Sequence, residues 1–114
     1  MVRRDRIVLQ KLLAESTLLA ELLNGIPEHS FLQDEKTKRA TSMTLINIGE
    51  LVKQLTDELR AENRHIPWKE IAGLRDVTAH RYFSMRWEDV YATASIDVPA
   101  LAREIRKLLG IVDD

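Results

Sequence analysis

Apolar residues recur every three or four positions along most of the chain, and this spacing constrains the fold more than any other feature. Between residues 3 and 24 the recurring positions are Leu9, Leu12, Leu13, Leu19, Ala20 and Leu23. Strand-like alternation is hard to find, and the 114 residues include only 4 glycines and 3 prolines. A period near 3.6 residues therefore predicts an all-α protein.

Glycine and proline mark the helix boundaries. Gly25 and Pro27 end the first predicted helix near residue 24, and a loop at 26–30 follows. A long second helix, antiparallel to the first, is predicted at 34–62, with an apolar stripe of Thr41, Thr44, Leu45, Ile48, Leu51, Val52, Leu55 and Leu59. Gly49 lies inside this helix, where it predicts the close approach of another backbone.

Two more helices complete the predicted fold. Pro67 suits the first turn of a helix over 68–82, and Ser84 is the predicted cap of the next one. In that last helix Trp87, Tyr91, Ala94, Val98, Leu101, Ile105, Leu108 and Val112 repeat at helical spacing, and Pro99 predicts a kink or split near Asp97. We expect one domain, residues 1–114, folded as an antiparallel bundle of four to five helices.

Composition excludes several classes of protein. The 17 basic and 18 acidic residues nearly cancel, so any nucleic-acid site must be a local basic cleft. The absence of cysteine excludes a thiol nucleophile and a zinc–thiolate site and is compatible with a cytoplasmic protein. No run of about 18 apolar residues predicts a membrane helix, and we read the charged N-terminus as part of the fold. The dispersed histidines and the lack of a glycine-rich phosphate loop predict no metal and no cofactor.

The residues best suited to catalysis are Arg75, His80 and Tyr82, which form the motif Arg-x4-His-x-Tyr. Arginine binds a phosphodiester with a planar, permanently charged fork, and histidine moves protons near pH 7. RNA carries its own nucleophile, the 2′-hydroxyl, so its cleavage needs only proton transfer and positive charge, which a histidine and an arginine can supply. The motif is thus a candidate RNA-cleaving site.

Helix geometry sets a condition on this site. On a straight helix Arg75 and Tyr82 lie within about 20° of each other, whereas His80 points about 140° away from Arg75. The three side chains converge only if the helix ends near Ala79 or if two protomers face each other across a shared cleft.

Taken together, these residues resemble the HepT-like toxins of the HEPN ribonuclease superfamily. The similarity includes Ile48-Gly49-Glu50, the run 66–74 before Arg75, 31–34 after the first helix and the late segment 97–101. It implies a homodimeric, metal-independent endoribonuclease that acts as the toxin of a toxin–antitoxin pair.

Site roles also follow from the resemblance. Arg75 and His80 correspond to the catalytic pair, and Tyr82 to the tyrosine on which a cognate minimal nucleotidyltransferase antitoxin places AMP. Arg81 and Asp76 are the neighbouring candidates for substrate binding. Asp76 is a departure, because the family often has asparagine there, and its carboxylate could orient Arg75 or Arg81.

Other readings of the same residues stay open. Arg75 could be a surface arginine and His80 a helix-end histidine, while Tyr82 and Phe83 could form a core aromatic pair. Glu50 is expected to be solvated or paired. At the level of function, the alternatives are a non-catalytic substrate-binding subunit of a nucleotidyltransferase complex and a plain helical dimerisation protein.

Overall fold

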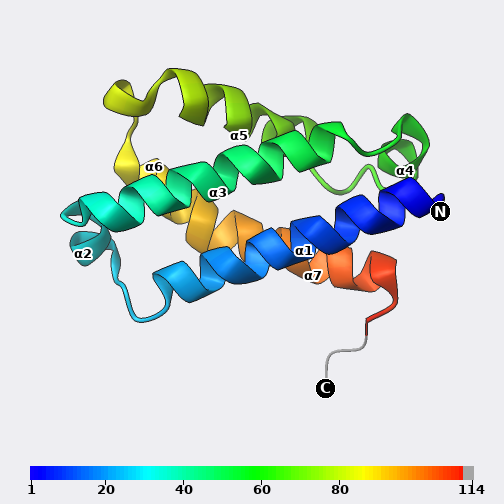
Figure 1. Ribbon diagram of the computed structural model, residues 1–114, viewed down its shortest axis with the longest axis horizontal. Helices are drawn as coiled ribbons and strands as arrows, with labels where there is room; N and C mark the ends of the chain where they lie inside the picture. The colour runs from blue at the N-terminus through cyan, green and yellow to red at the C-terminus, as the bar shows by residue number, and fades with distance from the viewer. Residues whose placement is uncertain (112–114) are drawn as a thin grey trace.

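The computed structural model describes residues 1–111, with residues 76–80 described by their helical backbone alone. Its frame consists of the long helices α1 (Arg3–Leu23), α3 (Glu35–Lys53), α5 (Trp68–His80) and α7 (Val98–Leu109). Successive long helices run in opposite directions, with α3 between α1 and α5, and α7 packed on α1 (Figure 1). No strand occurs within residues 1–111, so the predicted all-α antiparallel bundle is confirmed.

The core lies where the apolar stripes of α1, α3 and α7 meet. Its fully buried members include Leu9, Leu12, Leu19, Leu45, Ile48, Val52 and Ile105. The predicted stripes therefore face the core, except that Ala20 is exposed. The predicted stripe residue Val112 lies outside the described residues.

The predicted loop at 26–30 is shorter than expected, because the short helix α2 (Glu28–Leu32) begins inside it. This helix buries Phe31, whose ring lies 6.3 Å from that of Trp87 and 5.2 Å from that of Tyr91. The Tyr91 hydroxyl donates to the Ile26 carbonyl at 2.8 Å. Long-range aromatic packing, rather than a local apolar period, stabilises this turn of helix.

The predicted continuous helix at 34–62 is wrong, because α3 ends at Lys53 and a separate helix, α4 (Asp57–Glu62), begins after a short turn. Thr56 caps α4 by accepting from the Leu59 amide at 3.2 Å. The buried carboxylate of Asp5 accepts from both the Thr56 amide, at 2.9 Å, and its hydroxyl, at 2.5 Å. A carboxylate from the first turn of the chain thus stabilises the break.

The last predicted helix is divided near Asp97 as expected, and the division is a π-helical segment. It comprises α6 (Trp87–Ala92), a π-helical segment at Thr93–Asp97, and α7. Pro99, in the first turn of α7, cannot donate to an α-helical ladder, and a wider turn before it accommodates that loss. Ser84 is not the cap: Arg86 precedes α6, and the Ser84 hydroxyl donates to the Arg81 carbonyl.

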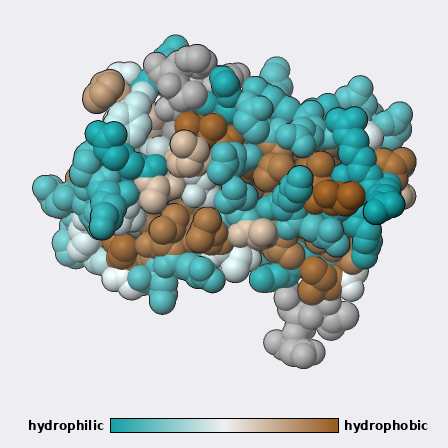
Figure 2. All heavy atoms as spheres, in the orientation of Figure 1, coloured by the Kyte–Doolittle hydropathy of each residue, from teal (hydrophilic) through white to brown (hydrophobic). Residues whose placement is uncertain are grey.

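The surface is mostly hydrophilic with exposed apolar patches, as Figure 2 shows for one face. The most exposed large apolar side chains include Met43, Phe83 and Ile96, which are 58%, 96% and 65% exposed. Within residues 1–111, no helix combines the length and apolarity that crossing a bilayer requires.

Candidate functional site

Arg75 is positioned by a close crossing of α3 and α5 at Gly49. A Cβ at Gly49 would lie 2.8 Å from both the Cβ and the backbone nitrogen of Arg75, and 3.1 Å from the Ala72 carbonyl oxygen. These distances are too short for any residue larger than glycine unless the helices move apart. The predicted close approach at Gly49 is confirmed, and its partner is the backbone of Arg75 itself.

Glu50, the next residue of α3, forms an ion pair with the motif arginine. Arg75 Nε lies 2.7 Å from Glu50 Oε1, with the two side chains 35% and 46% exposed. A partly exposed pair contributes about 1 kcal/mol or less to stability, and its short distance restricts where the guanidinium can lie. Sequence reasoning expected Glu50 to be solvated or paired, but did not identify Arg75 as its partner.

Tyr82 lies just beyond α5, in a 3-10 turn at Tyr82–Ser84. Its hydroxyl donates to Glu35 Oε1 at 2.9 Å, and its ring packs against that of Trp87 with centroids 5.1 Å apart. The guanidinium of Arg39 lies 5.2 Å from the ring centroid, within cation–π range. Tyr82 is therefore half-buried and bound by the beginning of α3.

Glu35 and Tyr82 shift each other's pKa. Burial and the hydrogen bond to Glu35 raise the pKa of the Tyr82 phenol above 10.0. The same hydrogen bond, with the charges of Lys38 and Arg39, lowers the pKa of the Glu35 carboxyl below 4.5. Near neutral pH the pair therefore consists of a neutral Tyr82 phenol hydrogen-bonded to an ionised Glu35 carboxylate. Neither Glu35 nor Arg39 was identified from the sequence, because no local spacing relates them to a residue 47 positions away.

The residues beside Tyr82 are exposed. Arg81 is solvent-facing, and Phe83 is 96% exposed although its ring contacts that of Tyr82 at 5.4 Å. The alternative of a buried Tyr82–Phe83 pair is therefore wrong for Phe83. An exposed arginine and an exposed aromatic ring offer charge and stacking to single-stranded nucleic acid.

The side chains of His80 and Asp76 lie outside the described residues. The backbone at both positions is helical, and α5 ends at His80, near Ala79 as one of the two sequence alternatives required. Within the described part, the structure does not bring Arg75 and Tyr82 to a common partner. Arg75 binds Glu50, whereas Tyr82 binds Glu35, fifteen residues earlier in the same helix and about 22 Å along its axis.

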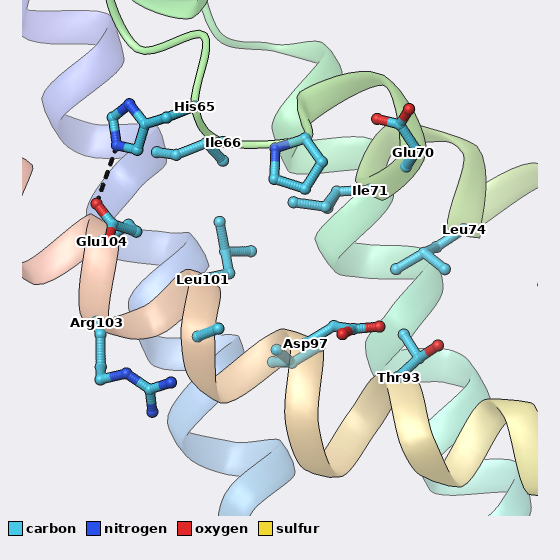
Figure 3. A pocket seen from close by; sticks show the side chains of 13 residues that line it. His65, Ile66, Glu70, Ile71, Leu74, Thr93, Asp97, Leu101, Arg103 and Glu104 are labelled. Carbon is cyan, nitrogen blue, oxygen red and sulfur yellow. Dashed lines mark hydrogen bonds and ion pairs between the residues drawn. The ribbon is translucent and has the colours of Figure 1, made fainter.

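A separate pocket of about 490 Å³ lies between α5, the loop before it and α7 (Figure 3). Its wall includes the apolar Ile71 and Leu74 of α5, and its polar groups include the carboxylates Glu70, Asp97 and Glu104 and the guanidinium of Arg103. Three carboxylates around an apolar floor disfavour a phosphodiester. Among the described residues, neither Arg75 nor Tyr82 lines this pocket, which is therefore distinct from the motif.

His65 and Glu104, which both line this pocket, form the polar contact drawn in Figure 3, with His65 Nε2 3.1 Å from Glu104 Oε2. That hydrogen bond and one from Lys107 lower the pKa of the Glu104 carboxyl. Among the described residues no cluster of three or more histidine or acidic side chains could hold a metal ion.

Comparison with known proteins gives a consistent family match. A family model described as "Ribonuclease HepT-like" matches residues 12–108. "Putative RNase TTE0752" of Caldanaerobacter subterraneus is 34% identical over 108 residues, covering 95% of this chain and 96% of that protein. "Probable ribonuclease HepT" of Thermococcus cleftensis is 31% identical, covering 95% and 98%. No solved structure matches this chain significantly.

Proposed function

Because this chain belongs to the HepT-like ribonuclease family, we propose that it is an endoribonuclease toxin that cleaves RNA through Arg75 and His80. The observation that carries the proposal is the placement of Arg75. A helix crossing that tolerates only glycine holds its backbone, and Glu50 orients its guanidinium. The close crossing distinguishes Arg75 from Arg39 and Arg60, which also form ion pairs.

The chemistry uses the nucleophile that RNA supplies. The 2′-oxygen attacks the adjacent phosphorus, the bond from phosphorus to the 5′-oxygen breaks, and a 2′,3′-cyclic phosphate forms. The 2′-hydroxyl loses a proton and the leaving 5′-oxygen gains one, and His80 transfers one of these protons. Arg75 stabilises the negative charge that develops on the phosphorane-like transition state. This scheme needs no metal ion.

Substrate contacts are assigned to Arg81 and Asp76 in this proposal. The exposed Arg81 binds phosphate through its charge, and Asp76 contributes by orienting an arginine. The near-neutral net charge of −1 makes these local contacts, rather than a general field, responsible for RNA binding.

The active form in this proposal is a homodimer with the two motifs facing a shared cleft. Within one chain Arg75 and Tyr82 bind opposite halves of α3, so the described part of a single chain does not gather the motif. Exposed apolar side chains such as Met43 and Ile96 provide surface for association. Light scattering at micromolar concentration should give twice the monomer mass of 13.1 kDa.

A cognate minimal nucleotidyltransferase is the proposed antitoxin. It transfers AMP onto Tyr82, whose two neighbours in the chain, Arg81 and Phe83, are both exposed. The added phosphodiester is a bulky anion that repels and occludes RNA at the motif, as phosphorylation does at other anion sites.

The test of the proposed function is RNA cleavage in the presence of a chelator by the wild type, Arg75→Lys and His80→Ala. Either substitution should lower the rate about 10²–10³-fold, because it removes either the planar guanidinium fork that binds the transition-state phosphorus oxygens or the proton carrier. Arg64→Gln, an exposed arginine outside the motif, is the matched control and should retain activity. Wild-type protein that leaves RNA intact while unmodified, although the nucleotidyltransferase can place AMP on it, would support the alternative of a non-catalytic substrate-binding subunit.

A further inference from the structure

We propose that Glu35 accepts the phenolic proton of Tyr82 when a nucleotide is transferred onto that tyrosine. The inference rests on the nucleotidylation proposed above. It assigns part of the transfer chemistry to the toxin itself rather than to the antitoxin alone.

The geometry of the pair is that of a nucleophile with its base. The Tyr82 hydroxyl donates to Glu35 Oε1 over 2.9 Å, which is within the range for direct proton transfer. Packing against Trp87 fixes the direction of the phenol ring, and the N-terminal turn of α3 fixes the position of Glu35. The acceptor is therefore in place before any partner binds.

The charged groups around Glu35 keep it ionised. Arg39 Nε lies 3.1 Å from the same oxygen that accepts from Tyr82, and Lys38 Nζ lies 3.5 Å from the other oxygen. Both cations come from α3, while α6 contributes the uncharged Trp87 ring, 4.9 Å from Lys38 Nζ. An ionised carboxylate is the form that can accept a proton.

This small cluster is also accessible to a second protein. The side chains of Glu35 and Arg39 are 57% and 64% exposed. Arg39 lies over the ring of the reacting tyrosine, 5.2 Å from its centroid, and its positive charge there favours the approach of nucleotide phosphates. The cluster thus combines a nucleophile, a base and a cation on an open surface.

The transfer step balances with a nucleoside triphosphate as the donor. Tyr82 Oη attacks the α-phosphorus of ATP, and the Oη–phosphorus bond forms. The bond from the α-phosphorus to the bridging oxygen of the β-phosphate breaks, and pyrophosphate leaves with that electron pair. The phenolic proton passes to Glu35, which later releases it to water.

A base is needed because the free phenolate is scarce. The raised pKa of Tyr82 leaves its phenol almost entirely protonated near pH 7. As the Oη–phosphorus bond forms, the phenol becomes much more acidic, and a hydrogen-bonded carboxylate can then take the proton without a free phenolate forming first.

The experiment measures AMP transfer to Tyr82 by the cognate nucleotidyltransferase with ATP and Mg²⁺, using full-length toxin and peptide-resolved mass spectrometry. Glu35→Gln should lower the maximal rate about 10²-fold, a typical size for the loss of a general base, with the KM for ATP unchanged. Glu35→Asp should recover part of the rate. Glu88→Gln, an exposed carboxylate of α6, is the matched control, and Tyr82→Phe should take up no AMP at this position.

Two further readouts separate a base from a merely structural residue. The rate for Glu35→Gln should rise with pH through the alkaline range, because phenolate then forms without a base, while the wild-type rate changes much less. Replacing Tyr82 by a fluorinated tyrosine, whose phenol is more acidic, should rescue Glu35→Gln more than it accelerates the wild type.

The outcomes distinguish this inference from the proposed function. Wild-type toxin that takes up no AMP at Tyr82 refutes the antitoxin reaction and, with it, the role of Glu35. Wild-type modification at Tyr82 with an equal rate for Glu35→Gln refutes only the role of Glu35. A slower Glu35→Gln that is rescued neither by alkaline pH nor by the fluorinated phenol also overturns the assignment as a base.

Discussion

The two described ends of the motif are positioned by different means. Arg75 is placed by its backbone, which contacts α3 so closely that Gly49 is required. Tyr82 is placed by side chains, through one hydrogen bond to Glu35 and ring contacts with Arg39 and Trp87. A backbone contact in a packed interior transmits any change in volume, whereas surface side chains can rearrange. The arrangement suits the proposed roles of the two residues, a fixed catalytic arginine and a tyrosine that a second enzyme modifies.

The largest effect is expected when one methyl group is added where α3 and α5 cross. Gly49→Ala should lower the free energy of unfolding by about 1–3 kcal/mol, because the new Cβ overlaps backbone atoms that no rotamer change can move. RNA cleavage should fall with it, since Arg75 shifts. Thermal or urea unfolding, followed by a cleavage assay, measures both effects.

Gly73 provides the matched control within α5. A Cβ there meets nothing within 4 Å, so Gly73→Ala should stabilise the protein by about 0.5–1 kcal/mol through helix propensity. Equal effects of the two substitutions would mean that α3 and α5 do not cross closely at Gly49.

A smaller effect is expected when the backbone contact is kept and only the ion pair is removed. Glu50→Ala should cost about 1 kcal/mol or less in stability, because the pair is partly exposed. Cleavage should nevertheless fall roughly 10-fold or more, because the guanidinium loses its orientation and small misplacements are costly to catalysis. Glu62→Ala, an exposed glutamate of α4, should change neither quantity. Unchanged cleavage by Glu50→Ala would show that the crossing alone positions Arg75.

The smallest expected effect is the loss of stability at low pH that comes from Glu35, the partner of Tyr82. The pKa of Glu35 is lower in the folded chain than its ordinary value of 4.5. Its contribution to stability is therefore fully present above the unfolded pKa and is lost as the pH falls through the folded pKa. The melting temperature of the wild type should fall more steeply below about pH 4.5 than that of Glu35→Gln.

Glu104 allows this acid effect to be assigned, because its pKa is lowered by different partners, His65 and Lys107. Glu104→Gln should remove its own share of the acid dependence and leave that of Glu35 intact. Identical pH profiles for the wild type and Glu35→Gln would argue against the hydrogen bond from Tyr82.

Much of the fold follows from the spacing of apolar residues and from the glycines and prolines that end helices. The stripe containing Leu9 and Leu12 and the stop at Gly25 are local signals, and the structure confirms both. The break before α4 could not be predicted, because it depends on Asp5, 51 residues away from Thr56. Likewise, α2 depends on Phe31 finding Trp87 and Tyr91 in a later helix.

The candidate site divides in the same way. Arg75 and Tyr82 could be singled out from spacing and residue chemistry, and Gly49 from its cost inside a helix. Their partners Glu50 and Glu35 could not, because an acidic residue on a long helix is most often solvated. The side chains of His80 and Asp76 lie outside the described residues, so their roles stay predictions.

By itself, then, the sequence determined the helical class, the antiparallel order of the long helices and the residue types available for chemistry on RNA. These properties depend on local spacing, which the chain carries in its order of residues. Only the tertiary structure decided which residues become neighbours: that Gly49 admits the backbone of Arg75, that Glu50 pairs with it, and that Glu35 accepts from Tyr82. The physical reason is that packing between helices selects contacts among residues distant in sequence, and no local period specifies which faces will meet.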